Sequence, residues 1–350
     1  MNIKHKGVFY FGFNSFSDHK RGVENVIDFQ SKASIFEHIY YFHWGSTTSA
    51  YKYLGFTCIS INNTWYWPLI LNLILFRLNK KNKFIIHSHN PLFSFFSAFK
   101  TDIFTVHDGL YYLNKLKKSR YKYLFLIIEL LLYFRCTFVH FISKFAKENS
   151  LFGNRKNFII IPNTTNFETL VVERKLYQNK PDEGFVLIVR SIEERARVDL
   201  ILDVAERLGA SDLRFVIVGK GPLLVRYQQE IADRKLLNVE MTGYVDDKKL
   251  LDLYSRCELV MMIAEYGEGF GLPIIEGYLF NKPVIASNCC AIPEVIISAD
   301  YLFENDVDSI IHSLNYVSNI KNVDYFKHYS LNFSNVVVFA QFQDLYKNFF

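Results

Sequence analysis

Residues 265–277 have the residue types that an anion-binding loop requires. Glycines at alternate positions, Gly267, Gly269 and Gly271, leave a backbone that side chains do not cover. Pro273 predicts a helix start, because its fixed φ suits a first helical turn and its missing N–H is not needed there. A loop that enters a helix N-terminus presents unpaired amides and the positive end of the helix dipole, which favour an anion.

Two carboxylates bracket this predicted anion site. Glu268 lies on the loop and Glu276 lies one turn into the predicted helix, with seven residues between them. A carboxylate repels a phosphate, so its presence indicates that a ligand rich in hydroxyl groups binds here as well. A sugar and a ribose joined by phosphates satisfy both requirements. The alternative is an ordinary loop–helix connection with a surface glutamate.

The whole pattern resembles the donor-site signature of family 4 of the retaining glycosyltransferases. The resemblance rests on Glu268-x7-Glu276 within E-G-F-G-L-P-x-x-E, on residues 281–287 and on Pro293-Glu294. That family has the GT-B architecture, an α/β fold of two Rossmann-like, doubly wound domains that face each other across a cleft. The resemblance implies that Glu268 holds hydroxyls of a donor sugar and that Glu276 accepts from ribose hydroxyls. The backbone would contact the donor at Gly269, Phe270, Gly271 and Leu272.

Arginines supply the positive charge that a diphosphate needs. Ligands of doubly wound sheets bind at the carboxyl ends of strands, and Arg190 stands at such a predicted end. Its planar fork can grip a diphosphate bidentately, which lysine cannot. The family generally has Gly-Arg here and Lys-Gly a few residues on, whereas this chain has Ile188-Val189 before the arginine and no lysine after it. Arg195 or Arg197 would take the second role, with Arg195 favoured; the alternative is that each is a surface cation.

Three further positions of the second half resemble donor-binding elements of the family. A Gly-x-Gly-Pro turn would pack Gly219 beside the nucleotide, although the third glycine of a dinucleotide fingerprint is absent. Tyr244 is expected either to stack on the base or to pack within the fold. Cys290 and Ala291 stand where the family has two glycines, and the cysteine adds bulk there. For the pair Cys289-Cys290, a small, half-buried hydrophobic role is favoured over a catalytic thiolate.

The first half carries fewer matches. Gly22 lies in a segment that resembles the family's Gly-Gly-x-Glu loop, with Arg21 in place of the first glycine. The resemblance implies that this loop approaches the donor phosphates and the acceptor, so Gly22 is expected to contact the donor. His107 matches the family's active-site histidine, where an imidazole donates a hydrogen bond to a sugar hydroxyl or orients the acceptor. His87 and His89 are a weak metal signal, because no carboxylate ligand is near them in sequence. We predict no metal and no cofactor, since side chains and helix ends neutralise the diphosphate in the family.

Both halves alternate short β-rich runs with helical ones, the pattern of parallel sheets with crossover helices. The predicted strands of the first half are residues 7–13, 38–43, 57–61, 84–87, 102–107, 137–142 and 157–161. Those of the second half are residues 185–190, 214–219, 238–242, 258–263, 283–287 and 301–303. Residues 162–166 and the polar stretch 173–184 are the best linker candidate. We expect domains at 1–165 and 166–334 and, by resemblance, a last helix over 335–350 that packs back on the first domain.

Length and composition agree with two domains in a reducing compartment. The 350 residues exceed the size at which one core keeps growing. A net charge of +5 is too small to indicate nucleic acid. Five cysteines without C-x-x-C spacing favour a cytoplasmic setting over a disulfide or zinc framework. We find no signal peptide, and the greasiest run, 121–134, is shorter than the ~20 residues that cross a bilayer.

Two segments of the first half suggest contact with a membrane surface. Residues 65–83 and 115–134 place aromatic and basic side chains beside apolar helices, which suits an anionic bilayer. The alternative is core helices with solvated ends. Members of the resembled family that build O-antigen, capsule or other surface glycans act on lipid-linked acceptors. We therefore expect peripheral binding at the inner face of the cell membrane.

Together these residues predict a retaining, metal-independent hexosyltransferase. The donor would be a UDP- or GDP-sugar, and the acceptor a glycan, in particular a lipid-linked oligosaccharide of O-antigen, capsule or lipopolysaccharide synthesis. Three rivals exist. The E-x7-E stretch disfavours a nucleotide-sugar epimerase of the same architecture, and the absent G-x-G-x-x-G disfavours an NAD dehydrogenase. A non-catalytic sugar-binding subunit would lack one of the carboxylates or cations.

Overall fold

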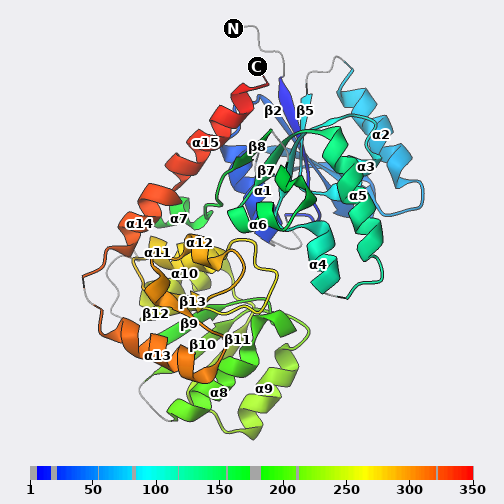
Figure 1. Cartoon of the computed structure of the whole chain (residues 1–350). Helices are drawn as coiled ribbons and strands as arrows, with labels where there is room; N and C mark the ends of the chain where they lie inside the picture. Colours follow the sequence, from blue (N-terminus) through cyan, green and yellow to red (C-terminus); the bar gives the residue numbers. More distant parts are fainter. Residues whose placement is uncertain are drawn as a thin grey trace. The chain divides into compact units, whose positions relative to one another are not determined.

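The computed structural model describes residues 6–16, 22–53, 55–80, 84–116, 118–154, 157–173, 183–209, 213–320 and 322–349. The chain forms two compact units. Unit 1 combines Met1–Thr164 with Asn335–Phe350, and unit 2 is Thr165–Ser334. Each unit is built on its own sheet, and the described part of the chain places helices on both faces of each sheet (Figure 1).

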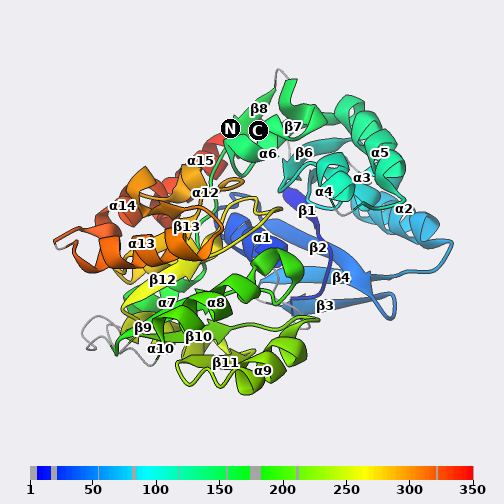
Figure 2. The same cartoon turned by 60° about the horizontal axis from the view of Figure 1, so that its bottom comes forward.

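The sheet of unit 1 has the strand order β3-β4-β2-β1-β5-β6-β7-β8. Figure 2 shows this order, from β3 and β4 in blue through β1 to β7 and β8 in green. Neighbouring strands are parallel except for the antiparallel pair of β3 and β4. The strands are β1 (Gly7–Phe11), β2 (His38–Gly45), β3 (Ser49–Tyr53), β4 (Phe56–Asn62), β5 (Phe84–Ser88), β6 (Thr101–Val106), β7 (Cys136–Phe141) and β8 (Phe158–Ile160).

Both faces of this sheet are apolar, because parallel strands are covered on each side by helices. Alternate residues of β1 point to opposite faces: Val8 and Tyr10 enter a core under α1 and α15, and Phe9 and Phe11 enter a core under α2 and α3. The helices are α1 (Gly22–Lys32), α2 (Trp67–Leu78), α3 (Pro91–Phe96), α4 (Leu110–Leu116), α5 (Lys122–Arg135), α6 (Lys144–Glu148) and α15 (Asn335–Lys347).

Helix α15 belongs to the core of unit 1, although the whole of unit 2 precedes it in the sequence. Val338, Phe342 and Leu345 are buried in the same cluster as the α1 face of the sheet. The hydroxyl of Tyr346 lies 2.7 Å from that of Tyr10, on β1. These contacts make α15 part of the structure that holds the strand ends of unit 1.

The sheet of unit 2 is fully parallel, with the order β11-β10-β9-β12-β13-β14. Helices α8, α9 and α13 lie on one side and α10, α11 and α12 on the other (Figure 1). This separation follows from right-handed crossovers, because the chain runs outward from β9 to β11 and then returns to β12. The strands are β9 (Phe185–Val189), β10 (Arg214–Val218), β11 (Val239–Gly243), β12 (Leu259–Met262), β13 (Val284–Ser287) and β14 (Leu302–Phe303).

The helices of unit 2 include the one that the glycines and Pro273 predict. They are α7 (Phe167–Glu173), α8 (Val198–Leu208), α9 (Leu224–Asp233), α10 (Asp247–Arg256), α11 (Leu272–Leu279), α12 (Ile292–Val295), α13 (Val307–Ser318) and α14 (Tyr325–Asn332). Gly277 lets α11 lie close to the sheet, since a Cβ there would come within 2.8 Å of Val284.

Every strand predicted from the sequence is present, with small displacements at the ends. The edge strand β3 was not predicted, because its S-A-Y-K-Y sequence is polar and its residues are mostly exposed. The predicted last helix is helical over Asn335–Lys347. Residues 174–182 of the predicted linker lie outside the described residues. In the described part of the chain, no helix has both the length and the apolar character needed to span a bilayer.

Candidate active site

The glycine loop, residues 263–271, connects β12 to α11 and ends at a helix N-terminus that no side chain caps. Gly271 precedes the helix with a φ of 93°, a conformation that L side chains rarely adopt. A Cβ at this position would also lie 2.9 Å from the side chain of Ile274. Pro273 occupies the first turn, as predicted. The first amides of α11 are therefore free of side-chain acceptors, which suits an anion.

Arg190 and Glu268 form an ion pair at this loop. Nη1 of Arg190 lies 2.6 Å from Oε2 of Glu268, and the two side chains are only 7% and 16% exposed. Removing one partner at this degree of burial would leave an uncompensated charge. The Nε of Arg190 is buried and has no hydrogen-bond partner among the residues that the structure describes. The guanidinium therefore keeps a donor that a bound anion can satisfy.

The topology of unit 2 explains why these two side chains meet. Arg190 follows β9 and Glu268 follows β12, and these strands are neighbours at the point where the strand order reverses. Ligands of doubly wound sheets bind at such a switch point. Gly219, after β10, packs on the same point, because a Cβ on it would collide with the carbonyl oxygen of Arg190. The glycine thus allows two strand ends to approach closely.

The two arginines that the sequence could not separate have different partners. Arg195 donates from Nη1 to the carbonyl oxygen of Gly267 at 2.5 Å, and its Nε lies 3.4 Å from a carboxylate oxygen of Glu193. Arg197 is tied to two carboxylates, Glu265 at 2.5 Å and Asp199 at 3.1 Å, which raise its pKa. Both arginines contact the glycine loop, but Arg197 is neutralised there by carboxylates, while Arg195 binds a backbone carbonyl of the loop.

Glu276 lies within unit 2 as a buried carboxyl group. Tyr254 donates a hydrogen bond to its Oε2 at 2.7 Å, and Thr165 donates to its Oε1 at 3.3 Å. Desolvation raises the pKa of Glu276 to about 7, although the two hydroxyl donors oppose the shift. No pattern in the sequence indicated Tyr254 or Thr165 as partners of Glu276. Each carboxylate oxygen can accept a second hydrogen bond.

Two other predicted positions of unit 2 differ in accessibility. Tyr244 is 70% exposed, so its ring is not part of a core, and Nζ of Lys220 lies 5.3 Å from the ring centroid. Cys289 and Cys290 are half-buried, and the Cys289 thiol lies 3.2 Å from the carbonyl oxygen of Ala264. Cys290 has a φ of 55°, a backbone conformation that suits the glycine found in the resembled family.

Cys290 also contacts the glycine loop. Its contacts with the Cys289 side chain and with the backbone amides of Glu268 and Gly267 lower the pKa of the Cys290 thiol. The same contact raises the pKa of Cys289. The half-buried position of the pair is the one that we expected, and its role stays a prediction.

In unit 1, Gly22 is the first residue of α1, with open space around its Cα. Residues 17–21 lie outside the described residues; they include Arg21, which stands where the resembled family has its first glycine. Glu24 is buried and accepts from the backbone amide of Asn14 at 2.9 Å. The predicted Gly-x-Glu segment therefore anchors the chain after β1 through its glutamate, a contact that the sequence pattern did not specify.

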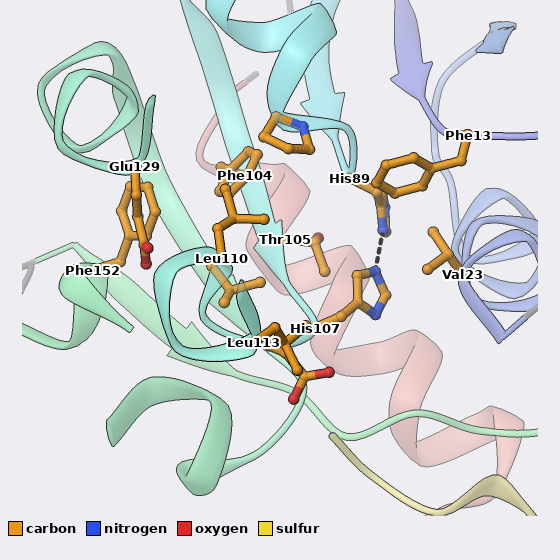
Figure 3. A pocket seen from close by; sticks show the side chains of 13 residues that line it. Phe13, Val23, His89, Phe104, Thr105, His107, Leu110, Leu113, Glu129 and Phe152 are labelled. Atoms are coloured by element: carbon orange, nitrogen blue, oxygen red, sulfur yellow. Dashed lines mark hydrogen bonds between the residues drawn. The ribbon is translucent and has the colours of Figure 1, made fainter. Parts of the chain in front are cut away.

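His107 follows β6 and lines a pocket of about 230 Å³ in unit 1 (Figure 3). Apolar side chains form most of the wall, from Phe13 and Val23 on one side to Leu110, Leu113 and Phe152 on the other. The ring nitrogens His89 Nδ1 and His107 Nε2 lie 2.8 Å apart. Burial lowers the pKa of His107 to about 3, so the imidazole is neutral near pH 7. A neutral ring can accept or donate a hydrogen bond but carries no charge.

The floor of this pocket is held by Glu129, a buried residue of α5. Its carboxylate accepts from the backbone amides of Tyr111 at 3.1 Å and Leu151 at 3.1 Å. It thereby ties α4 to the segment before β8. Among the described residues, no group of three or more histidine, cysteine, aspartate or glutamate side chains is placed to hold a metal ion.

Comparison with known proteins supports this description. Residues 172–328, which lie within unit 2, match the family model described as glycosyl transferases group 1. The O-antigen chain mannosyltransferase C of Escherichia coli is 30% identical over 142 residues, which are 39% of this chain and 38% of that protein. The chain spans about two fifths of the length of the curated relatives that it matches first.

Solved structures resemble the chain over nearly its whole length. Sucrose-phosphate synthase from Thermosynechococcus elongatus covers 98% of this chain and 99% of its own, with a TM-score of 0.77 and 15% identity. Anabaena HepE in complex with UDP and glucose covers 98% and 100%, with a TM-score of 0.76 and 14% identity. At this identity the likeness shows the fold, and the chain has the GT-B architecture that the sequence predicted.

Proposed function

We propose that the chain is a retaining glycosyltransferase that transfers a hexose from a UDP- or GDP-sugar to a glycan acceptor of surface polysaccharide synthesis. The observation that carries the proposal is the Arg190–Glu268 pair at the glycine loop, inside the segment that matches the glycosyl transferases group 1 model. The names of relatives support the class, since they include O-antigen chain mannosyltransferases and a D-rhamnosyltransferase.

The donor would bind by exchanging partners at this pair. Arg190 turns its fork, with the unsatisfied Nε, toward the diphosphate, while Glu268 accepts from hydroxyls of the donor sugar. Arg195 is the second cation, because Arg197 is already neutralised by Glu265 and Asp199. The pre-formed ion pair keeps both groups charged and oriented before the donor arrives, which reduces reorganisation during the reaction.

The nucleoside would lie between Glu276 and Tyr244. Glu276 has one free acceptor site on each oxygen for the ribose hydroxyls. Tyr244 presents an exposed ring on which a base can stack. A structural neighbour in complex with UDP and glucose supports a nucleotide-sugar as the ligand class.

Charge on the departing diphosphate would be stabilised by Arg190, Arg195 and the N-terminus of α11. These groups supply the positive potential that a metal ion supplies in other transferases, so we propose metal-independent transfer. Retention would follow from attack on the same face that the diphosphate leaves, with a phosphate oxygen taking the acceptor proton. A double displacement would need a second carboxylate below the anomeric carbon, and the sequence offers no distinct candidate.

We propose a lipid-linked acceptor because unit 1 has an apolar face beside its basic residues. Helices α2 and α5 both pack against α3 (Figures 1 and 2). We call the large exposed side chains on these two helices and just before α2 the α2–α5 face. They are Trp65, Leu69, Leu73, Phe76, Tyr123, Leu124, Ile127, Leu130, Leu131 and Phe134. Exposed apolar patches of this kind mark interaction surfaces, and Lys115 and Lys118 beside them suit anionic lipids. Binding would place the chain peripherally on the cytoplasmic face of a membrane.

A thermal-shift screen of nucleotide-sugars tests the proposal. A donor that binds only the folded state raises the melting temperature, by mass action. We expect one UDP- or GDP-sugar to do so, and the shift to disappear in Glu268→Gln. Absence of any shift across UDP-, GDP-, dTDP- and ADP-sugars would contradict the proposal. If a nucleotide-sugar both raises the melting temperature and is converted to its epimer in the absence of acceptor, the chain would instead be an epimerase.

A further inference from the structure

Behind His107 lies a line of buried polar groups that the proposed donor chemistry does not use. His89 Nδ1 lies 2.8 Å from His107 Nε2 (Figure 3). On its other side, His89 Nε2 lies 3.0 Å from Oε1 of Gln30. Gln30 and His89 are 0% and 2% exposed. The three side chains come from α1, from the residue after β5 and from the residue after β6, and they end at the pocket.

Hydrogen-bond chemistry fixes the protons along this line. An amide oxygen only accepts, so His89 donates from Nε2 to Gln30. A neutral imidazole has one N–H, so His89 accepts at Nδ1 and His107 donates from Nε2. The Nδ1 of His107 is then unprotonated. Burial lowers the pKa of both rings, which keeps them neutral near pH 7.

The orientation of the buried Gln30 amide therefore determines the tautomer of His107. Gln30 Nε2 is buried and has no hydrogen-bond partner in the part of the chain that the structure describes. If the amide turned over, Nε2 would donate to His89, both rings would exchange their tautomers, and His107 would carry its proton on Nδ1. Which atom Gln30 presents to His89 decides whether His107 offers a lone pair or an N–H at Nδ1.

A second line of imidazoles runs close by and supplies a control. His140 donates to the carbonyl oxygen of Ile161 at 3.0 Å, and Thr105, His87 and Tyr346 continue that line toward α15. No hydrogen bond among the described residues joins it to Gln30, His89 or His107. The rings of His87 and His89 stack with their centroids 5.0 Å apart, so the control is placed at His140, whose replacement changes the second line and leaves every hydrogen bond of the first in place.

We propose that Gln30 and His89 are positioning residues that hold His107 as the Nε2–H tautomer, with a hydrogen-bond acceptor at Nδ1. The consequence for catalysis rests on the proposed function: Nδ1 accepts from a sugar hydroxyl and does not donate to it. His107 thereby selects a ligand that presents an O–H at this position, and an ether or methoxy group there is rejected.

Nitrogen NMR of the full chain labelled with ¹⁵N-histidine tests this directly. Two-bond ¹H–¹⁵N spectra at pH 7 separate the two tautomers, and His107→Asn assigns the signals. We expect His107 in the wild type to be protonated on Nε2. Gln30→Met, which removes the amide, should give a mixture of tautomers. Gln30→Glu, which keeps an acceptor at the same reach, should restore the single tautomer, and His140→Gln should leave it unchanged.

The outcomes separate the Gln30–His89–His107 relay, in which the first two side chains set the tautomer of the third, from the proposed function. A wild-type His107 protonated on Nδ1, or a tautomer that Gln30→Met does not alter, would overturn the relay, and the wild-type spectrum decides even where a variant does not fold. In a transfer assay, Gln30→Met should lower kcat about tenfold with the donor KM unchanged, the effect of one lost oriented hydrogen bond, and Gln30→Glu should retain activity. The expected spectra without any transfer would leave the relay intact and remove the proposed function.

Discussion

Arg190 is bound to Glu268 before any ligand arrives, so its replacement affects two interactions at once. Arg190→Lys keeps the charge but loses the planar fork and the Nε donor. We expect turnover to fall by about 10²–10³-fold, the cost of removing one preorganised donor from a site of charge development, while the melting temperature changes little. Steady-state kinetics and a melting curve check this. Near-normal turnover would show that the diphosphate is held elsewhere.

We expect the charge of Glu276 to lower the stability of unit 2 and to strengthen nucleotide binding. Burial raises the pKa of Glu276 from 4.5, the value of an exposed glutamate, to about 7 in the folded chain. A raised folded pKa contributes stability that is complete below the unfolded value and is lost as the pH rises through the folded value. Well above pH 7 the buried charge therefore costs about 3 kcal/mol.

Glu276→Gln should consequently raise the stability of unit 2 at pH 8 by about 2 kcal/mol and weaken nucleotide binding by about 1–3 kcal/mol. Denaturant unfolding followed by circular dichroism gives the first value, and calorimetry with UDP and GDP gives the second. Unchanged nucleotide affinity would remove the assignment to the ribose. Unchanged stability would show that Glu276 is not desolvated in solution.

Membrane binding by α2 and α5 is best tested with several substitutions at once, because many exposed side chains on these helices contribute to it. If the α2–α5 face binds an anionic membrane, replacing Lys115, Lys118 and Lys122 with Glu should release the chain, at about 1 kcal/mol for each basic residue near the surface. Flotation with phosphatidylglycerol vesicles at low and physiological salt measures this, because screening weakens the attraction.

The same charge change on unit 2, at Lys235, Lys248 and Lys249, is the matched control and should not affect flotation. Equal binding by both triple variants, or no binding by the parent chain, would contradict the membrane proposal. The apolar face would then be left for a protein partner.

At this scale the sequence was most informative where one pattern fixed one element. Alternating and continuous apolar runs located the strands, and Gly271 with Pro273 located the start of α11. The pairing of Arg190 with Glu268 could not be derived, because it depends on β9 and β12 being neighbours. Gln30 gave no signal at all, since a glutamine on a helix looks exposed until the helix face is known.

At the scale of the molecule, acid should destabilise unit 1 selectively. Burial lowers the pKa of His87, His89, His107 and His140. A depressed histidine pKa means that the unfolded chain binds protons first as the pH falls below about 6.5. Stability is thus complete above pH 6.5 and is lost below it, by about 1.4 kcal/mol per pH unit for each fully neutral ring.

The tryptophans make this measurable. All three, Trp44, Trp65 and Trp67, lie in unit 1, so their fluorescence follows the unfolding of that unit alone. We expect the urea midpoint by fluorescence to fall clearly between pH 7 and pH 5.5. A midpoint that does not change over this range would show that the four rings are hydrated or already charged.

Because unit 1 is built from two separate parts of the sequence, its folding depends on the order in which the ribosome synthesises them. Translation delivers strands β1 to β8 first, then the 170 residues of Thr165–Ser334, and α15 only afterwards. During that interval the α1 face of the first sheet lacks Phe342 and Tyr346, and the hydroxyl of Tyr10 lacks its contact with that of Tyr346. Unit 2, which is continuous, can fold first. The apolar face of unit 1 stays exposed until α15 has been synthesised, and a chaperone would be needed during that interval.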